Sequence, residues 1–267
     1  MDFVWTIPGD FMTTDTLLTQ GMAQDRMRQS VIGLALAILL IGSWLALHIT
    51  TIFFWPFPWS EETRWLLPLA VLGLTWLYVA IFIVAHDCMH GTVTPSWPWL
   101  NPWIGRLCLF LYAAFSFDRM REAHRQHHQN PATEHDPDFD AREDDSFWFW
   151  YLKFFAEYFG FREFMIVFAV TGLYMAAGAP YQALLMFWML PSMLSSLQLF
   201  VFGTYLPHRR LEEPYTDRHR TRSNDYPWIV SLLTCLHFGY HHEHHSTPGV
   251  PWWRLPQLHA QRRERRT

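Results

Sequence analysis

Three long stretches of the sequence contain no Asp, Glu, Lys or Arg, and they constrain the fold more than any other feature. Residues 31–60, 65–86 and 164–207 are such stretches, with 30, 22 and 44 residues. About 20 apolar residues cross a bilayer as a helix, so each of the first two stretches predicts one crossing. Helices of soluble proteins rarely stay apolar on all sides over this length. The sequence therefore indicates an integral membrane protein.

The third stretch is too long for one crossing and contains the sequence Gly178-Ala179-Pro180, which predicts a turn between two helices. The predicted fold is all-α, a single domain over residues 1–267 with four transmembrane helices and a helical cap. The spans are predicted at 31–55, 65–86, 161–177 and 181–205, and the cap at 1–30, 87–160 and 206–267.

Basic residues predict the orientation of these spans. Arg26 and Arg28 precede the first span, the middle segment and the tail are rich in arginine, and the connector after the first span has only Arg64. Because basic residues favour the cytoplasmic side, both termini and the cap are predicted in the cytoplasm, with the spans in the inner membrane. The basic tail 262–266 is interpreted equally as a contact with anionic membrane lipid or as a solvated segment.

Nine of the 15 histidines gather in four places at or beyond the predicted cytoplasmic face. They occur in the sequences HDCMH, HRQHH, TYLPHRR and HHEHH. Hydropathy and basic residues gave the topology without use of histidine, so this clustering is an independent observation. The candidate metal ligands are His86, His90, His124, His127, His128, His208, His241, His244 and His245.

The spacing of these histidines has a direct physical meaning. Residues three or four apart on a helix share a face, so the imidazoles of HxxxH and HxxHH can converge on one ion. A transition ion takes four to six ligands, and nine imidazoles therefore suit two ions. The sequence predicts a dinuclear, nitrogen-rich site in the cap, and imidazole is compatible with Fe, Zn, Cu or Ni.

Five other histidines are interpreted as residues that do not bind metal, and His237, four residues before His241, is either a ligand or an outer residue, with the outer role favoured. His48 lies inside the first span and is predicted to pack there, and His242 is one position off the ligand face. His135, His219 and His259 are predicted to be solvated. Metal-bound histidine usually donates its second ring N–H to a carboxylate or carbonyl, although each nearby carboxylate is equally compatible with a solvated surface role. The candidate outer residues are Asp87, Asp118, Glu122, Asp136, Asp138, His237 and Glu243.

These motifs resemble those of the membrane fatty acid desaturase/hydroxylase superfamily of histidine-ligated di-iron enzymes. Longer motifs at 86–91 (HDCMHG), 135–140 (HDPDFD), 202–209 (FGTYLPHR) and 232–256 (LLTCLHFGYHHEHHSTPGVPWWRLP) resemble the bacterial β-carotene ketolases within it. The resemblance covers about residues 31–256. The chain departs from that family at Cys88, where Ala is typical, and at Ala132, where Gly is common. Neither departure touches a candidate ligand, and both leave small differences in substrate preference open.

The resemblance implies iron at both sites, O₂ as co-substrate and electrons from an external donor of the ferredoxin type. It implies that β-carotene enters from the bilayer and is converted to echinenone and canthaxanthin. The route would be two successive hydroxylations at C4 and C4′, with dehydration to the ketone. The di-iron centre would be the catalytic group, without a separate protein acid or base. The sequence has no G-x-G-x-x-G nucleotide motif, and its pI near 6.4 gives no support to nucleic-acid binding.

Other functions remain open from the residues alone. The same ligand set would serve a carotenoid ring hydroxylase, an acyl-lipid desaturase or an alkane hydroxylase. A histidine-rich metal transporter is a further alternative, but transporters place ionisable residues inside their spans, and these spans contain few. The substrate-binding residues, and which histidine serves which ion, are not predicted.

Overall fold

The computed structural model describes residues 14–142, 146–212, 214–215 and 217–265, and all regular secondary structure in these ranges is helical. The all-α fold predicted from the sequence is therefore confirmed. The first part of the predicted segment 1–30, and Arg266 of the basic tail, lie outside the described residues.

Three helical stretches are long and apolar enough to cross a membrane, namely Met22–Phe54, Arg64–Met89 and Tyr181–His208. The first consists of α1 (Thr14–Ile49) and a π-helical turn (Thr50–Phe54), and the second of a 3₁₀ turn (Arg64–Leu66) and α2 (Leu67–Met89). The third runs through α7 (Tyr181–Leu184), a π-helical turn (Leu185–Met189), α8 (Leu190–Leu199), a second π-helical turn (Phe200–Tyr205) and α9 (Leu206–His208). These stretches cover the first, second and fourth predicted spans.

The predicted third span corresponds to a bent pair of helices. α5 (Phe147–Tyr158) and α6 (Phe161–Ala176) meet at an angle of 77° and satisfy the length and composition of a span only together. Gly160 at the bend has an extended backbone, and its N–H donates to Glu163 Oε2 at 3.1 Å, which caps α6. The described residues thus contain three candidate crossings, or four if the bent pair counts as one.

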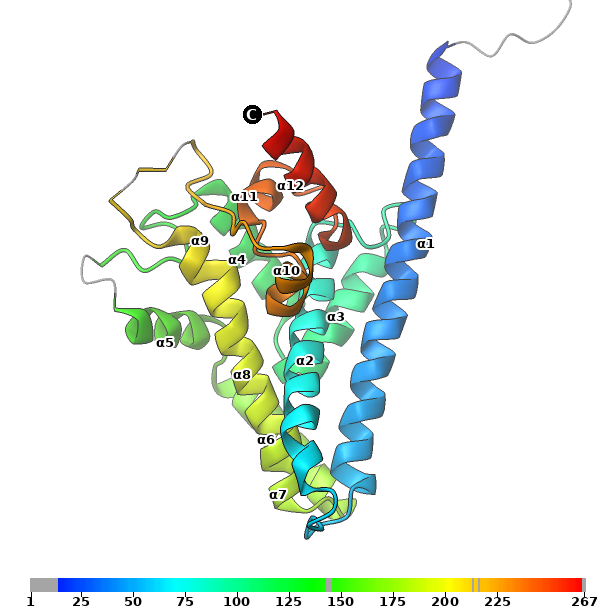
Figure 1. Ribbon diagram of the computed structural model, residues 1–267, viewed down its shortest axis with the longest axis vertical. Helices are drawn as coiled ribbons and strands as arrows, with labels where there is room; N and C mark the ends of the chain where they lie inside the picture. Colours follow the sequence, from blue (N-terminus) through cyan, green and yellow to red (C-terminus); the bar gives the residue numbers. More distant parts are fainter. Residues whose placement is uncertain (1–13, 143–145, 213, 216, 266–267) are drawn as a thin grey trace, which may run out of the picture.

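The remaining helices lie beside the upper half of α2 or above it (Figure 1). They are α3 (Leu100–Ala113), α4 (Phe117–Gln129), α10 (Trp228–Cys235), α11 (His241–Ser246), a 3₁₀ turn (Trp252–Arg254) and α12 (Leu255–Glu264). α4, α11 and α12 lie at the same end as the start of α1, while the end of α1, the start of α2 and α7 lie at the opposite end (Figure 1). The two terminal segments and the middle segment therefore share one end, as the four-span topology requires.

α2 is the central helix, and it carries the first histidine motif into the cap. It packs against α1, α3 and α8, and its second half is almost fully buried. Tyr78, Ile81 and Ile83 have no solvent exposure. Such close packing fixes the direction in which the last turn of α2 presents His86 and His90.

The first long helix begins well before its charge-free stretch. α1 starts at Thr14, whereas the first span was predicted from residue 31. Residues 14–30 contain good helix formers such as Leu, Met, Gln and Arg and no proline, so the helix continues through them. The absence of charge marks the apolar part of a helix and gives no information on where the helix begins.

Gly33 allows α1 to pack closely against the loop after α2. A Cβ atom at Gly33 would lie 2.1 Å from the Val93 carbonyl oxygen, whereas a Cβ at Gly42 would meet nothing within 4 Å. We expect Gly33→Ala to displace α1 and lower the thermal midpoint in detergent, because a backbone oxygen cannot rotate away. Gly42→Ala is the matched control and should raise or keep the midpoint, since Ala favours a helix over Gly by about 1 kcal/mol. Equal midpoints for both variants would contradict this role of Gly33.

Candidate metal centre

The structure brings the nine candidate histidines together in two groups at the cap end of the bundle. Within each group, one ring nitrogen from every histidine lies within 4.8 Å of all the others. The first group consists of His86, His90, His124, His128 and His244, and the second of His127, His208, His241 and His245. The sequence predicted two ions, and the structure divides the ligands between two places.

Each HxxHH motif contributes to both groups in a reciprocal way. On α4, the pair His124 and His128 (i, i+4) belongs to the first group, and His127 between them belongs to the second. On α11 the assignment is reversed, because His241 and His245 belong to the second group and His244 to the first. The two helices thus link the two groups.

The distances within the groups fit ligands that share an ion. His124 Nε2 lies 2.9 Å from His86 Nε2, 2.8 Å from His90 Nε2 and 3.1 Å from His128 Nε2. One imidazole nitrogen has a single proton or a single lone pair, so it cannot form three such hydrogen bonds. Two nitrogens that lie about 2.1 Å from one ion at a right angle are about 3.0 Å apart.

The second group has the same spacing. His241 Nε2 lies 3.0 Å from His208 Nε2 and 3.1 Å from His245 Nε2, and His245 Nε2 lies 3.1 Å from His127 Nε2. All four histidines are at most 3% exposed, so water is largely excluded from their ring nitrogens. The residues present therefore fit a metal ion in each group.

Several ligands direct their other ring nitrogen outwards to an acceptor. His127 Nδ1 lies 2.9 Å from both carboxylate oxygens of Asp136, and His86 Nδ1 lies 3.3 Å from Asp87 Oδ1. His208 Nδ1 lies 2.9 Å from the carbonyl oxygen of Arg220. Such acceptors favour the tautomer with the proton on Nδ1, which leaves the Nε2 lone pair free for a metal.

Burial keeps most of these histidines neutral. Burial, together with the neighbouring His127, lowers the pKa of His90 to about 4. Burial, followed by the effect of nearby imidazoles, lowers the pKa of His124 and His244 well below the usual value. Neutral imidazole is the form that binds a metal, so these ligands are ready at neutral pH.

The pair His127 and Asp136 behaves differently. Burial lowers the pKa of His127, but the charge and the hydrogen bond of Asp136 outweigh it and leave this pKa above its usual value. Burial raises the pKa of Asp136, but the charge of His127 and the hydrogen bonds to Asp136 outweigh it and leave this pKa below its usual value. An anionic Asp136 would offset part of the positive charge of an ion in the second group.

Three candidate outer residues form their polar contacts with residues other than the candidate ligands. Asp118 pairs with Arg106 at 3.0 Å and with Arg121 at 3.3 Å, and Glu122 pairs with Arg125. Both acids form these ion pairs on the exposed surface of α4. His237 Nδ1 lies 3.1 Å from Ser231 Oγ, and its ring packs near aromatic side chains.

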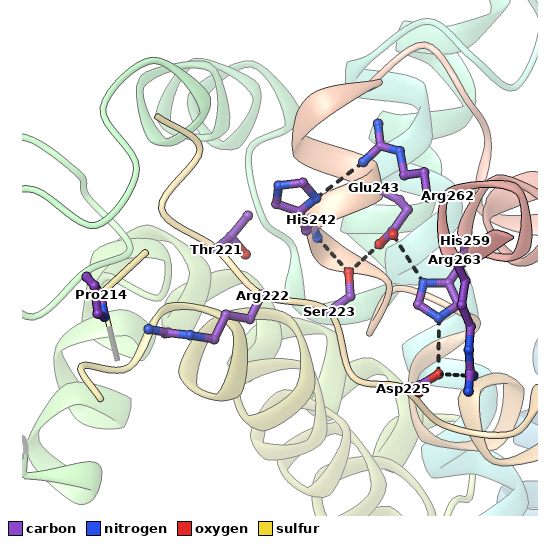
Figure 2. Close-up of a pocket in the computed structure, with 10 residues that line it drawn as sticks. All are labelled: Pro214, Thr221, Arg222, Ser223, Asp225, His242, Glu243, His259, Arg262 and Arg263. Atoms are coloured by element: carbon purple, nitrogen blue, oxygen red, sulfur yellow. Dashed lines mark hydrogen bonds and ion pairs between the residues drawn. The ribbon is translucent and has the colours of Figure 1, made fainter. Parts of the chain in front are cut away.

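The outer face of α11 lines a polar pocket (Figure 2). His242 Nε2 lies 2.7 Å from Asp217 Oδ2, so His242 faces away from the ligands, as its position in the motif predicts. Glu243 accepts hydrogen bonds from Ser223 Oγ and from His259 Nδ1, the latter at 3.1 Å (Figure 2). His259, predicted to be solvated, stacks on the ring of Tyr240 at 4.3 Å because α12 folds back onto α11. These contacts orient α11 from its outer side.

A narrow cavity adjoins both histidine groups. Its volume is ≈ 50 Å³, and it is lined by ligands of both groups, by Asp138, Tyr158 and Thr204, and by apolar side chains. A second space of ≈ 20 Å³ shares part of this lining and continues to Tyr112 and Phe115 at the end of α3. The shared residues are Phe82, Met120, Phe154, Tyr158 and Leu199. The sequence contains no signal for Tyr158, because nothing in an aromatic run shows which of its residues lines a cavity and bonds a buried carboxylate.

The chain is similar to known proteins of a single family. The fatty acid desaturase family matches residues 62–266. A β-carotene ketolase of Paracoccus sp. (strain N81106) is 46% identical over 219 residues, which cover 81% of this chain and 88% of the relative. A second β-carotene ketolase, of Paracoccus sp. (strain PC1), is 44% identical over 85% of this chain and 90% of the relative. A zeaxanthin 4-ketolase of Chlamydomonas reinhardtii is 33% identical over 86% of this chain and 54% of the relative.

Proposed function

The chain belongs to the fatty acid desaturase family, and within this family we propose that it is a β-carotene ketolase. It converts β-carotene to echinenone and then to canthaxanthin by oxidation of the ring carbons C4 and C4′. The observation that carries this proposal is the similarity to Paracoccus β-carotene ketolases over more than four-fifths of the chain. The two histidine groups beside a cavity with many apolar side chains in its lining support it.

We propose that each histidine group holds one iron ion. The five histidines of the first group and the four of the second supply only nitrogen ligands, which suit iron, and the family favours iron over zinc or copper. Iron supplies the activation of O₂, which no side chain of the protein can perform. Asp87 and Asp136 hold His86 and His127 in the required tautomer.

The proposed reaction balances with O₂ and an external reductant. Each oxidation replaces one C–H bond at C4 by a C–OH bond, consumes one O₂, two electrons and two protons, and releases one water. A second oxidation of the same carbon gives a geminal diol, which loses water to form the ketone. As the resemblance to the ketolases implies, the electrons come from a separate ferredoxin-type protein.

The cavity beside the histidine groups is proposed as the place of the β-carotene ring. Its walls include Phe82, Met89, Phe154 and Leu199, which exclude water from the reacting carbon. At ≈ 50 Å³ it is too small for a ring, so these side chains must move when the substrate enters. Methionine adapts well to such a change, because its unbranched side chain has three rotatable bonds. The neighbouring space leads towards α3 and α8, and we propose that the substrate enters there from the bilayer.

We propose that the histidine end faces the cytoplasm and that the spans lie in the inner membrane. The start of α1, the middle segment and the C-terminal helices share this end, and these are the arginine-rich parts of the sequence (Figure 1). The electron donor would then reach the site from the cytoplasm. The whole chain would act as one membrane oxygenase domain.

Expression in a host that accumulates β-carotene tests the proposal. We expect carotenoids in which a ring has gained one oxygen atom and lost two hydrogen atoms, as detected by chromatography and mass spectrometry. An empty vector gives the background. A 3-hydroxylated ring would favour a hydroxylase, and a desaturated lipid without change in the carotenoids would favour an acyl-lipid desaturase. Iron transport into the cells without a new pigment would favour a transporter.

A further inference from the structure

A buried carboxylate and a buried phenol form a pair in the wall of the cavity. Asp138 lies in the loop after α4, and Tyr158 is the last residue of α5. The Tyr158 hydroxyl donates to Asp138 Oδ1. The two residues are only 9% and 8% exposed, and both line the cavity together with His124 of the first group and His127 of the second.

The position of this pair is fixed relative to the second histidine group. Trp150 Nε1 donates to the carbonyl oxygen of Asp138 at 2.7 Å. The backbone N–H of Asp138 donates to Asp136 Oδ1 at 2.9 Å, and Asp136 in turn accepts the hydrogen bond of His127 Nδ1. The Asp138 carboxylate is therefore held by the same short loop that orients a metal ligand.

The pair is unusual in a cavity for a hydrocarbon. Apart from the histidine ligands and Thr204, the remaining lining is apolar. A polar group loses its hydration when it is buried, so a carboxylate and a phenol would not be needed to hold a substrate without polar atoms. In the proposed reaction, the first bound species with a polar atom is the ring alcohol that the first oxidation produces.

We propose that Asp138 and Tyr158 form the binding site for the hydroxyl group of this C4 alcohol. Asp138 accepts the hydrogen bond of the alcohol, and Tyr158 holds the carboxylate towards the cavity. The alcohol therefore stays beside the histidine groups until its second oxidation, instead of leaving for the bilayer. This inference rests on the proposed ketolase function and adds to it a reason why the reaction proceeds to the ketone.

Tyr158→Phe is the most specific test, because it removes one hydroxyl and keeps the ring. In cells that accumulate β-carotene, we expect this variant to raise the ratio of 4-hydroxy to 4-keto carotenoid about five- to tenfold. This factor corresponds to the free energy of one hydrogen bond. Asp138→Asn should raise the same ratio. Tyr151→Phe is the matched control, since Tyr151 lies on the same helix, bonds Ser196 at 3.4 Å and is outside the cavity lining.

A second measurement separates binding of the alcohol from a structural role. Membranes that contain the full-length protein, with a reduced ferredoxin, are supplied either with β-carotene or with its 4-hydroxy derivative. We expect Tyr158→Phe and Asp138→Asn to raise KM for the alcohol several-fold more than KM for β-carotene. A structural defect would lower kcat for both substrates alike.

The outcomes distinguish the inference from the function on which it rests. If the wild-type protein forms neither 4-hydroxy nor 4-keto carotenoid, the proposed function fails. If the wild-type protein forms the ketone and the variants keep its product ratio and both KM values, the function stands and this inference is overturned. An equal loss of both activities in the variants would also overturn it.

Discussion

His245→Ala is expected to abolish ketone formation and to lower the iron content, whereas His242→Ala on the same short helix should change neither. His245 Nε2 lies 3.1 Å from the Nε2 atoms of both His127 and His241, in the centre of the second group. The His242 ring instead points outwards from α11 and pairs with Asp217. Removal of a ligand leaves an open position and alters the ligand field, so we expect a loss of at least about 100-fold in activity.

The comparison between these two variants isolates metal binding from a general effect on α11. Both variants replace one histidine by alanine three residues apart on one helix. Iron per protein, measured on the purified proteins in detergent, should fall only for His245→Ala. The amount of protein inserted in the membrane serves as the control for folding. Near-normal pigment from His245→Ala would contradict the assignment of the second group.

The membrane-spanning part of the fold follows from the sequence where helices are straight. The charge-free stretches around α1, α2 and α8 are long enough to identify these helices. The bend at Gly160 could not be predicted, because a glycine between two aromatic runs is compatible with a continuous helix or with a break. Nothing in the sequence gives the angle of 77° between the two helices.

The histidine motifs predict that the ligands converge, but not which ion each ligand serves. On a helix, positions i and i+4 differ by about 40° in direction, and positions i+3 and i+4 by about 100°. An HxxHH motif therefore points to two neighbouring places. The rotation of α4 and α11 about their axes determines which histidine group each i, i+4 pair joins. Tertiary packing sets that rotation.

The sequence does not show which of the acidic residues lie beside a candidate ligand. Asp118 and Asp136 are both close to the HRQHH motif in the sequence, and nothing in the sequence alone separates them. The structure separates them because the loop after α4 folds back to His127, whereas Asp118 lies on the exposed side of the same helix. A loop that folds back onto its own helix produces no periodic pattern in the sequence.

Asp136 is therefore expected to affect metal binding far more than Asp118. Both oxygens of Asp136 lie 2.9 Å from His127 Nδ1, and they also accept the backbone N–H groups of Ala132 at 2.8 Å and Asp138 at 2.9 Å. An asparagine has one acceptor oxygen, and its NH₂ group would face one of these donors. Asp136→Asn therefore removes the negative charge beside His127 and leaves at least one buried donor without a partner.

We expect Asp136→Asn to lower the affinity for iron and the rate of ketone formation by about 10- to 100-fold, the usual effect of a lost carboxylate partner of a metal-bound histidine. Asp118→Asn is the matched control and should change both by less than about twofold, because its exposed ion pairs with Arg106 and Arg121 contribute little. Iron retained after dialysis against a chelator measures the affinity separately from activity. If Asp136→Asn retains as much iron as Asp118→Asn, then His127 binds its ion without help from the loop, and the hydrogen bond between His127 and Asp136 only stabilises the fold.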